Sequence, residues 1–322
     1  MIDLLKIQPH KVSRDLSGYI TYIYGIPKVG KTTFGSQMPG ALILAFERGY
    51  DALPGAMAQD ITSWIELKQV LRELKKPEVM KVYHSLIIDT VDVAATLCEK
   101  YICNQLDIEN IGDGGWSTNG WSKYKKEFED TFRTMSQLGY AILFISHSTD
   151  KTFTRKDGTT YNQMVPTAQR SVNEIVKGMA DIYACADIVN GERRLILRST
   201  DGTVDCGCRF RYMDSEIPFS YQSLVDALNR AIDKEASETN NKFVTNERES
   251  EPIVQTYDYD ALMKEFQTMT GDLMHKDPSY GPKITAIVDK YLGKGKKVSE
   301  ATPDQVEFIN VINEEIKSDL MK

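Results

Sequence analysis

The sequence predicts an α/β protein with a mostly parallel sheet, followed by a small helical unit. Short apolar stretches rich in β-branched residues alternate, over residues 20–146, with longer stretches that carry apolar residues at helical spacing. This alternation is typical of a parallel sheet covered by helices. A polar segment near residue 240 then separates this region from further helical stretches.

The elements of the predicted sheet follow in a regular order. Strands are expected at residues 20–25, 41–46, 84–89 and 140–146. Helices are expected at residues 31–38, 62–76, 90–106 and 121–138.

The pattern changes after His147. Residues 148–166 are polar, and Asp157-Gly158 suits the turn of a small hairpin. A helix is expected over 168–179. Asn190-Gly191-Glu192 then joins the two arms of a second hairpin, and an amphipathic helix is expected over 219–233.

These elements divide the chain into three parts. We expect a core over residues 1–233, a linker over 234–252 and a helical C-terminal domain over 253–322. The linker is polar and poor in large apolar residues. Three stretches beyond it show helical periodicity, at 258–274, 281–292 and 303–320.

Composition sets broad limits on function. The 322 residues are 41% hydrophobic, which is enough for a sizeable core. The net charge of −7 argues against a generally basic nucleic-acid-binding protein, although it allows a local basic groove. We find neither a signal peptide nor an apolar run long enough to span a membrane, so we expect a cytoplasmic protein without membrane contact.

The cysteines predict no special chemistry. Their odd number and irregular spacing do not resemble a disulfide framework. Cys206-Gly-Cys208 has no second Cys/His pair nearby, which argues against a zinc site.

Residues Gly25 to Thr32 carry the most specific motif. The run Gly25-Ile26-Pro27-Lys28-Val29-Gly30-Lys31-Thr32 matches G-x-x-x-x-G-K-[ST], the P-loop. Its glycines let backbone N–H groups surround phosphates, and the following helix, which includes Thr33, presents its positive end to them. Lys31 is expected at the β- and γ-phosphates and the Thr32 hydroxyl on Mg²⁺. The predicted ligand is therefore a nucleoside triphosphate, with Mg-ATP as our expectation.

Asp89 ends the apolar strand LIID, which is the position of a Walker B carboxylate that orients Mg²⁺. The alternative is a helix cap at a strand end. We favour the Mg²⁺ role because the strand lies downstream of a P-loop.

Two further strand ends carry candidate catalytic groups. Glu47 follows the second strand and could activate the attacking water, or could simply pair with Arg48 at the surface. Asp92 is the competing candidate. His147 ends the fourth strand, where a polar residue can contact the γ-phosphate and signal its loss to the following loop. Its alternative is a structural histidine.

Two loops mix basic and aromatic residues. Such a mixture suits single-stranded nucleic acid, because cations follow phosphates and rings stack on bases. Packing aromatics in solvated loops would give the same pattern. The candidate DNA contacts are Lys123, Lys125, Lys126, Lys151, Phe153, Arg155, Lys156 and Arg170.

Taken together, the motifs resemble the RecA-like ATPase core. The residues that carry the resemblance are GIPKVGKT, Glu47, LIIDT and ILFISH, in that order. More narrowly, residues 15–230 resemble phage-encoded AAA family ATPases related to RecA, including the Sak-type group implicated in single-strand annealing.

This resemblance implies an ATPase that acts on single-stranded DNA in phage recombination, annealing or repair, within the host cytoplasm. It also implies self-association into a ring or filament, and a phage single-strand-binding protein as a further partner. In such assemblies a neighbouring subunit supplies a cation, for which Arg198 and Arg209 are the candidates here. The chain departs from RecA in having His147 where a glutamine is usual, which puts strand exchange in doubt.

Two alternatives stay open from the sequence. One is a P-loop nucleotide switch or assembly ATPase that acts on a protein partner without DNA. The other is a module that holds nucleotide and hardly hydrolyses it.

Overall fold

The structure is a computed structural model that describes residues 9–14, 16–240, 242–246, 257–302 and 305–321. The chain divides into two compact units. One contains the described residues between 9 and 246, and the other contains the described residues between 257 and 321.

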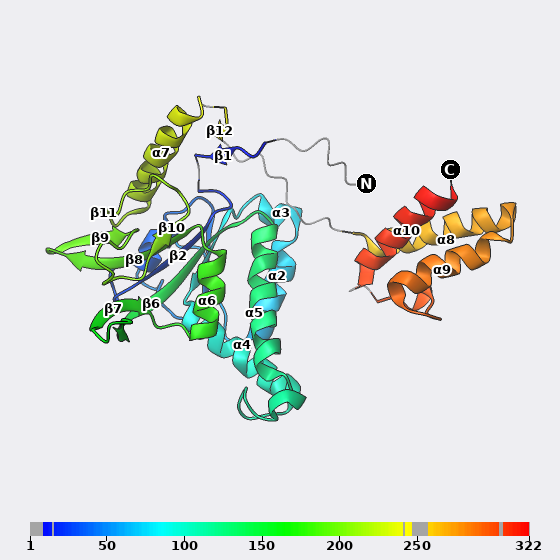
Figure 1. Cartoon of the computed structure of the whole chain (residues 1–322), viewed down its shortest axis with the longest axis horizontal. Helices are drawn as coiled ribbons and strands as arrows, with labels where there is room; N and C mark the ends of the chain where they lie inside the picture. Colours follow the sequence, from blue (N-terminus) through cyan, green and yellow to red (C-terminus); the bar gives the residue numbers. More distant parts are fainter. Residues whose placement is uncertain (1–8, 15, 241, 247–256, 303–304, 322) are drawn as a thin grey trace. The chain divides into compact units, whose positions relative to one another are not determined.

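The larger unit is built on a mixed sheet with a parallel centre (Figure 1). The parallel strands, in spatial order, are β8 (Ile182–Val189), β2 (Ile20–Gly25), β6 (Ala141–Thr154), β5 (Ser85–Asp89), β3 (Ala41–Ala45) and β4 (Ala58–Asp60). Antiparallel strands β9 (Glu192–Ile196) and β11 (Glu216–Pro218) extend the β8 edge, and β10 (Gly207–Cys208) also pairs with β8. This arrangement confirms the predicted α/β class.

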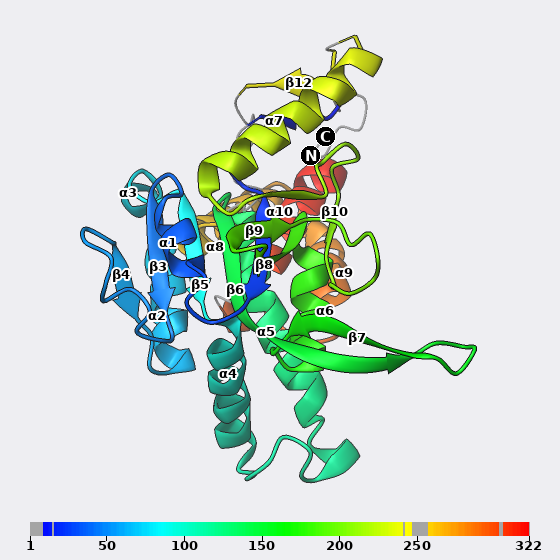
Figure 2. The same cartoon turned by 90° about the vertical axis from the view of Figure 1, so that its left-hand side faces the viewer.

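Helices cover both faces of the sheet (Figures 1 and 2). On one face lie α1 (Lys31–Ser36) and α7 (Tyr221–Glu238). On the other lie α2 (Trp64–Leu74), α4 (Val91–Leu106), α5 (Gly120–Gln137) and α6 (Arg170–Met179). Two short helical segments, α3 (Pro77–Met80) and a 3₁₀ turn at Gly115–Ser117, connect neighbouring elements.

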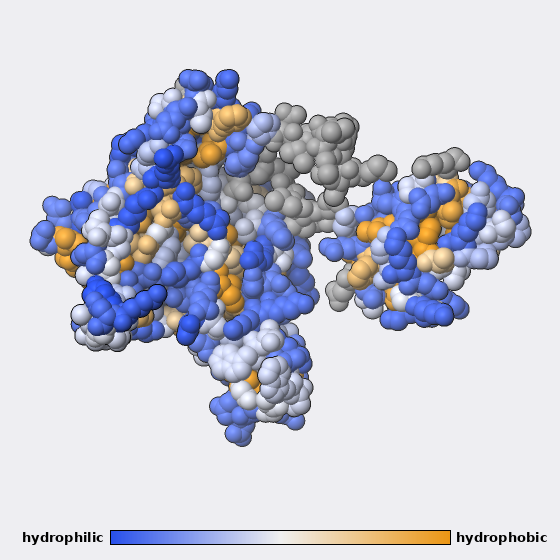
Figure 3. All heavy atoms as spheres, in the orientation of Figure 1, coloured by the Kyte–Doolittle hydropathy of each residue, from blue (hydrophilic) through white to orange (hydrophobic). Residues whose placement is uncertain are grey.

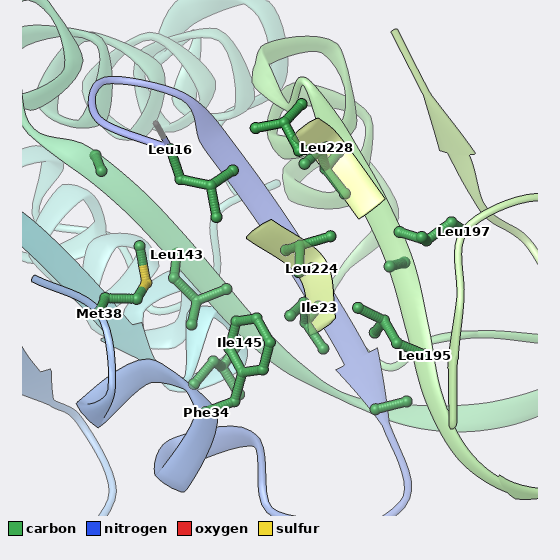
Figure 4. Packing of buried hydrophobic residues seen from close by; sticks show 14 of the residues in the cluster. Leu16, Ile23, Phe34, Met38, Leu143, Ile145, Leu195, Leu197, Leu224 and Leu228 are labelled. Carbon is green, nitrogen blue, oxygen red and sulfur yellow. The ribbon is translucent and has the colours of Figure 1, made fainter. Parts of the chain in front are cut away.

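Apolar strand residues meet apolar helix residues on each face. Figure 4 shows Ile23, Leu143 and Ile145 of the sheet against Phe34 of α1 and Leu224 of α7. On the opposite face, Phe132 of α5 packs edge-on against Phe144 of β6, with ring centroids 5.2 Å apart. Strands buried on both faces explain why the sequence shows continuous apolar runs rather than alternation.

Strand β6 is longer than the sequence predicts. We expected it to end at residue 146, but it continues to Thr154 and pairs antiparallel with β7 (Thr160–Pro166). Residues beyond His147 have left the core, so they are polar although extended. The hairpin at Asp157-Gly158 is confirmed, and Figure 2 shows it projecting away from the sheet.

The expected linker at 234–252 is wrong in its first part. Helix α7 continues through Glu238, because Ala236 is buried and extends its apolar face. Strand β12 (Val244–Thr245) then pairs in parallel with β1 (Val12–Ser13). Residues 247–252 of the expected linker lie outside the described residues.

The smaller unit contains α8 (Tyr259–Lys276), α9 (Tyr280–Leu292), a 3₁₀ turn (Val298–Glu300) and α10 (Val306–Leu320). Its own apolar cluster includes Leu273, Ile287 and Ile312. The buried amide of Asn313 donates to the Leu262 carbonyl (3.0 Å) and to Glu265 (3.1 Å), which ties α10 to α8. No helix in the described ranges of either unit is long and apolar enough to cross a membrane.

Candidate nucleotide-binding site

The P-loop leaves the sheet at the carboxyl end of β2. Gly25 is needed there because a Cβ would lie 2.0 Å from the carbonyl oxygen of Ala186 on β8. The loop then uses positive φ angles at Lys28 (64°) and Gly30 (108°) before α1 begins. Such left-handed residues turn successive backbone N–H groups toward one side, as an anion site requires.

Lys31 lies beneath this loop. Only 7% of the residue is exposed, and its Nζ donates to the carbonyl oxygens of Gly25 (2.8 Å) and Ile26 (2.9 Å). Burial lowers the pKa of Lys31, and the nearby carboxylates, led by Asp89, oppose this shift. The loop carbonyls thus fix the ammonium group at the phosphate-binding turn.

Thr32 and Asp89 face each other at the start of α1. The Thr32 hydroxyl donates to Asp89 Oδ2 at 2.7 Å, and Asp89 is only 4% exposed. Burial raises the pKa of Asp89, while the Thr32 hydrogen bond lowers it and the charge of Glu47 raises it further. A buried carboxylate beside a hydroxyl is an oxygen donor set that fits Mg²⁺, which takes one or two protein oxygens together with phosphates.

Gly49 lies against this pair. A Cβ on Gly49 would stand 3.2 Å from Thr32 Oγ1 and 3.3 Å from Asp89 Oδ2. The loop after β3 therefore approaches the Thr32–Asp89 pair with bare backbone. This glycine could not be identified from the sequence, because only the order of the strands shows that this loop reaches the P-loop.

Glu47 is fixed by residues from two neighbouring strand ends. Its Oε1 accepts from the Thr90 hydroxyl at 2.7 Å, and its Oε2 lies 3.4 Å from His147 Nε2. The backbone N–H groups of Phe46 and Glu47 both donate to the Asp89 carbonyl. Strands β3, β5 and β6 are adjacent and parallel, so their carboxyl ends bring these residues together.

Asp92 is tied to the base of the β6–β7 hairpin. Its Oδ1 accepts from the Thr167 hydroxyl at 2.5 Å, and the Thr167 N–H donates to the carbonyl oxygen of His147. This competing catalytic candidate is therefore held by the hairpin, whereas Glu47 is held by Thr90 and His147.

The two arginines expected to act across subunits are engaged within their own chain. Arg198 donates to the carbonyl oxygens of Phe210 (2.5 Å) and Arg211 (2.8 Å). Arg209 pairs with Asp181 at 3.0 Å, beside the first residue of β2. A role in a neighbour's site would require them to give up these bonds, and it stays a prediction.

A different arginine lies beside the P-loop. The Arg193 Nη1 atom is 3.6 Å from the position that a Cβ would take on Gly30. Arg193 was not among the site residues predicted from the sequence. The feature that could have identified it is its position as the second residue of the predicted hairpin's second strand, next to the turn and at the carboxyl edge of the sheet.

The expected DNA contacts fall on three parts of the fold, namely the β6–β7 hairpin, the start of α6 and the start of α5. Lys151 and Phe153 lie on the outer part of β6, with Arg155 and Lys156 in the following turn. Arg170 begins α6 and pairs with Glu174 at 2.9 Å. The remaining three lysines are exposed near the start of α5, namely Lys123, Lys125 and Lys126.

The fold and this site together define a nucleotide-binding protein of the P-loop class. A family model described as "AAA domain" matches residues 17–209, which is more than half of the chain. The chain belongs to this AAA domain family, and this membership suggests a nucleotide-dependent ATPase. It is also similar to the SPbeta prophage-derived uncharacterized protein YorG of Bacillus subtilis (strain 168). The two are 28% identical over 327 residues, which cover 98% of each chain.

Proposed function

We propose that this protein hydrolyses Mg-ATP and couples hydrolysis to the binding of single-stranded DNA. One observation carries the proposal. His147 contacts Glu47 and is also the residue after which β6 leaves the sheet to form the β6–β7 hairpin. A change at the phosphate site can therefore reach the hairpin through His147, which belongs to the same strand.

The site residues take the following roles in this proposal. The backbone of residues 25–33 binds the phosphates, and Lys31 neutralises their charge. Thr32 and Asp89 hold Mg²⁺, which supplies charge stabilisation to the transferring phosphoryl group. Glu47 orients and deprotonates the attacking water, because the bonds to Thr90 and His147 fix its carboxylate.

One face of the β6–β7 hairpin supports the DNA contact. Phe153 lies directly opposite Tyr161, and their rings stack with centroids 5.7 Å apart. The Arg155 guanidinium lies 4.4 Å above the Tyr161 ring. Lys151 shares the face with Phe153, because alternate residues of a strand point the same way. Side chains of this region are mostly hydrophilic in Figure 3, at its lower left.

Such a face suits a single strand better than a duplex. Exposed rings stack on unpaired bases, with about 1–3 kcal/mol per base, and the cations follow the phosphates. A surface of this kind is tolerant of sequence, because every base offers a ring face.

The setting we propose is phage DNA recombination, single-strand annealing or repair in the host cytoplasm. The prophage origin of the relative YorG supports it. The resemblance to the Sak-type group of RecA-like proteins adds self-association, as a ring or a filament, and a phage single-strand-binding protein as partner. The division into a core and a helical C-terminal domain, joined by a linker that begins only after helix α7, also stays a proposal.

A second candidate function has its own observation. Trp116 at the tip between α4 and α5 is 96% exposed, and the same connection carries Asp107, Glu109 and Asp113. An exposed tryptophan among carboxylates suits a protein partner better than DNA. This feature favours a nucleotide switch or assembly ATPase that acts without DNA.

The deciding experiment measures ATP hydrolysis with and without single-stranded DNA, across a range of salt concentrations. We expect stimulation by DNA that weakens with salt, because phosphate contacts release counterions. Replacing both rings, Phe153→Ala with Tyr161→Ala, should abolish the stimulation and leave the basal rate.

Thr152→Ala is the matched control. Thr152 lies on the opposite face of the same hairpin, where its hydroxyl bonds Asn162 at 2.8 Å, so stimulation should survive its loss. Absence of DNA binding even at low salt would overturn the DNA proposal and favour the protein-directed alternative. Absence of hydrolysis under every condition would leave a nucleotide-binding module.

A further inference from the structure

Arg193 approaches the P-loop from the β8–β9 edge of the sheet, whereas the Thr32–Asp89 pair lies toward β5. The P-loop strand β2 lies between β6 and β8. Glu47, Asp89 and His147 all come from the β6 side, whereas Arg193 comes from β9, beyond β8.

The register of β9 directs this side chain toward α1. Leu195 of the same strand and Leu197, which directly follows it, belong to the apolar cluster beneath α1 and α7. Because alternate residues of a strand point to the same face, Arg193 points there too, but beyond the edge of the cluster. This direction accounts for the 3.6 Å separation between its Nη1 atom and the Cβ position of Gly30.

The backbone of Arg193 is held in place by the core. Its carbonyl oxygen accepts from the Phe219 N–H at 3.0 Å. The Phe219 ring stacks on Phe34 of α1, with centroids 5.3 Å apart and planes 5° from parallel. The strand that carries the arginine is thus fixed relative to the helix that follows the P-loop.

The guanidinium group itself is exposed and unengaged. Among the described residues, it has neither a hydrogen-bond partner nor an ion-pair partner. The adjacent Arg194 points to the other face and is bound by Glu216 at 2.6 Å. Of these two neighbouring arginines, Arg193 is therefore the one left as an unpaired cation beside the phosphate-binding loop among the described residues.

We propose that Arg193 binds the phosphate chain of the nucleotide held by its own P-loop. It approaches the α- and β-phosphates from the flank away from Mg²⁺. A guanidinium suits this position because its planar donors match phosphate oxygens. This inference rests on the nucleotide site of the proposed function, but not on DNA binding or hydrolysis.

The test is the affinity of the full-length protein for fluorescent ATP and ADP analogues at fixed Mg²⁺. Arg193→Ala should weaken both nucleotides about tenfold, the effect of losing one charge-assisted hydrogen bond. Arg193→Lys should recover part of the loss. Arg194→Ala is the matched control and should bind like the wild type.

Four results would overturn the inference, and the last of them would overturn the nucleotide site as well. Unchanged affinity in Arg193→Ala would show that the cation touches no nucleotide. A loss confined to ATP would place the contact at the γ-phosphate instead. Recovery of hydrolysis on mixing Arg193→Ala with Lys31→Ala would show that the arginine acts across subunits. If the wild type bound neither analogue, the nucleotide site itself would fail, and the inference with it.

Discussion

Gly49 lets the loop after β3 pack closely against the Thr32–Asp89 pair, because it has no side chain. Gly49→Ala should fold normally, because the φ of Gly49 lies outside the left-handed region. Its Cβ would crowd both oxygens that we assign to Mg²⁺, so we expect hydrolysis to fall about tenfold, corresponding to roughly 1.4 kcal/mol of barrier. Titrating the rate with Mg²⁺ checks this, since the half-saturating concentration should rise. Gly178→Ala, with open space around the new carbon, serves as the control, and an unchanged Mg²⁺ requirement in Gly49→Ala would refute the assignment.

Asp89 is a buried carboxylate whose protonation should affect the stability of the protein. Burial raises its pKa in the folded protein, so the folded state holds the proton more tightly than the unfolded state. Above the ordinary pKa of an aspartate, this group therefore makes the free energy of unfolding decrease as pH rises, until its folded pKa is passed.

Asp89→Asn removes that titration, which isolates it from all other groups. The stability of the wild type minus that of Asp89→Asn, measured by urea unfolding without nucleotide, should decrease with pH across this window. A difference that is flat or increases with pH would mean that the carboxylate is not penalised by burial. The same variant should lose metal-dependent hydrolysis.

A side-chain hydrogen bond between Thr167 and Asp92 connects the base of the β6–β7 hairpin to α4. Thr167→Val keeps the shape of the side chain but removes the hydroxyl that donates to Asp92. Since Asp92 Oδ2 is already buried without a partner in the described structure, its other oxygen would lose its bond as well. We expect a cost of about 1 kcal/mol and a fall in melting temperature of about 2–4 °C.

Thr159→Val provides the comparison for this measurement. Its hydroxyl bonds Asp157 in the solvent-exposed turn of the same hairpin, where water replaces the lost partner, so its melting temperature should stay near the wild-type value. Equal effects of the two substitutions would show that the Thr167–Asp92 bond does not anchor the hairpin.

The elements also show what the sequence could predict. The central strands were predictable because burial on both faces makes them continuous apolar runs. Glu47, Asp89 and His147 could be proposed as neighbours, since all three follow parallel strands at the same edge. The short strands β4 and β11 were missed, because three residues carry no periodic signal. The proximity of Arg193 and Gly49 to the P-loop depends on strand order, which local patterns do not contain.

At the scale of the whole molecule, the two units have separate apolar clusters, one in the sheet and one among α8, α9 and α10. We propose that they unfold independently. Calorimetry of the full chain should then show two transitions. Mg-ATP should raise only that of the larger unit, because binding stabilises by RT ln(1 + [L]/Kd), about 2.7 kcal/mol at a hundredfold excess over Kd.

Ile312→Asp tests this independence directly. Ile312 is fully buried in α10, so a carboxylate there should cost at least about 4 kcal/mol and eliminate the transition of the smaller unit. The neighbouring Val311→Asp places the same charge at a position that is 40% exposed, and that transition should remain. In both variants the nucleotide-dependent shift of the larger unit should be unchanged. A loss of that shift in Ile312→Asp alone would show that the helical unit contributes to nucleotide binding, and the proposed independence would have to be abandoned.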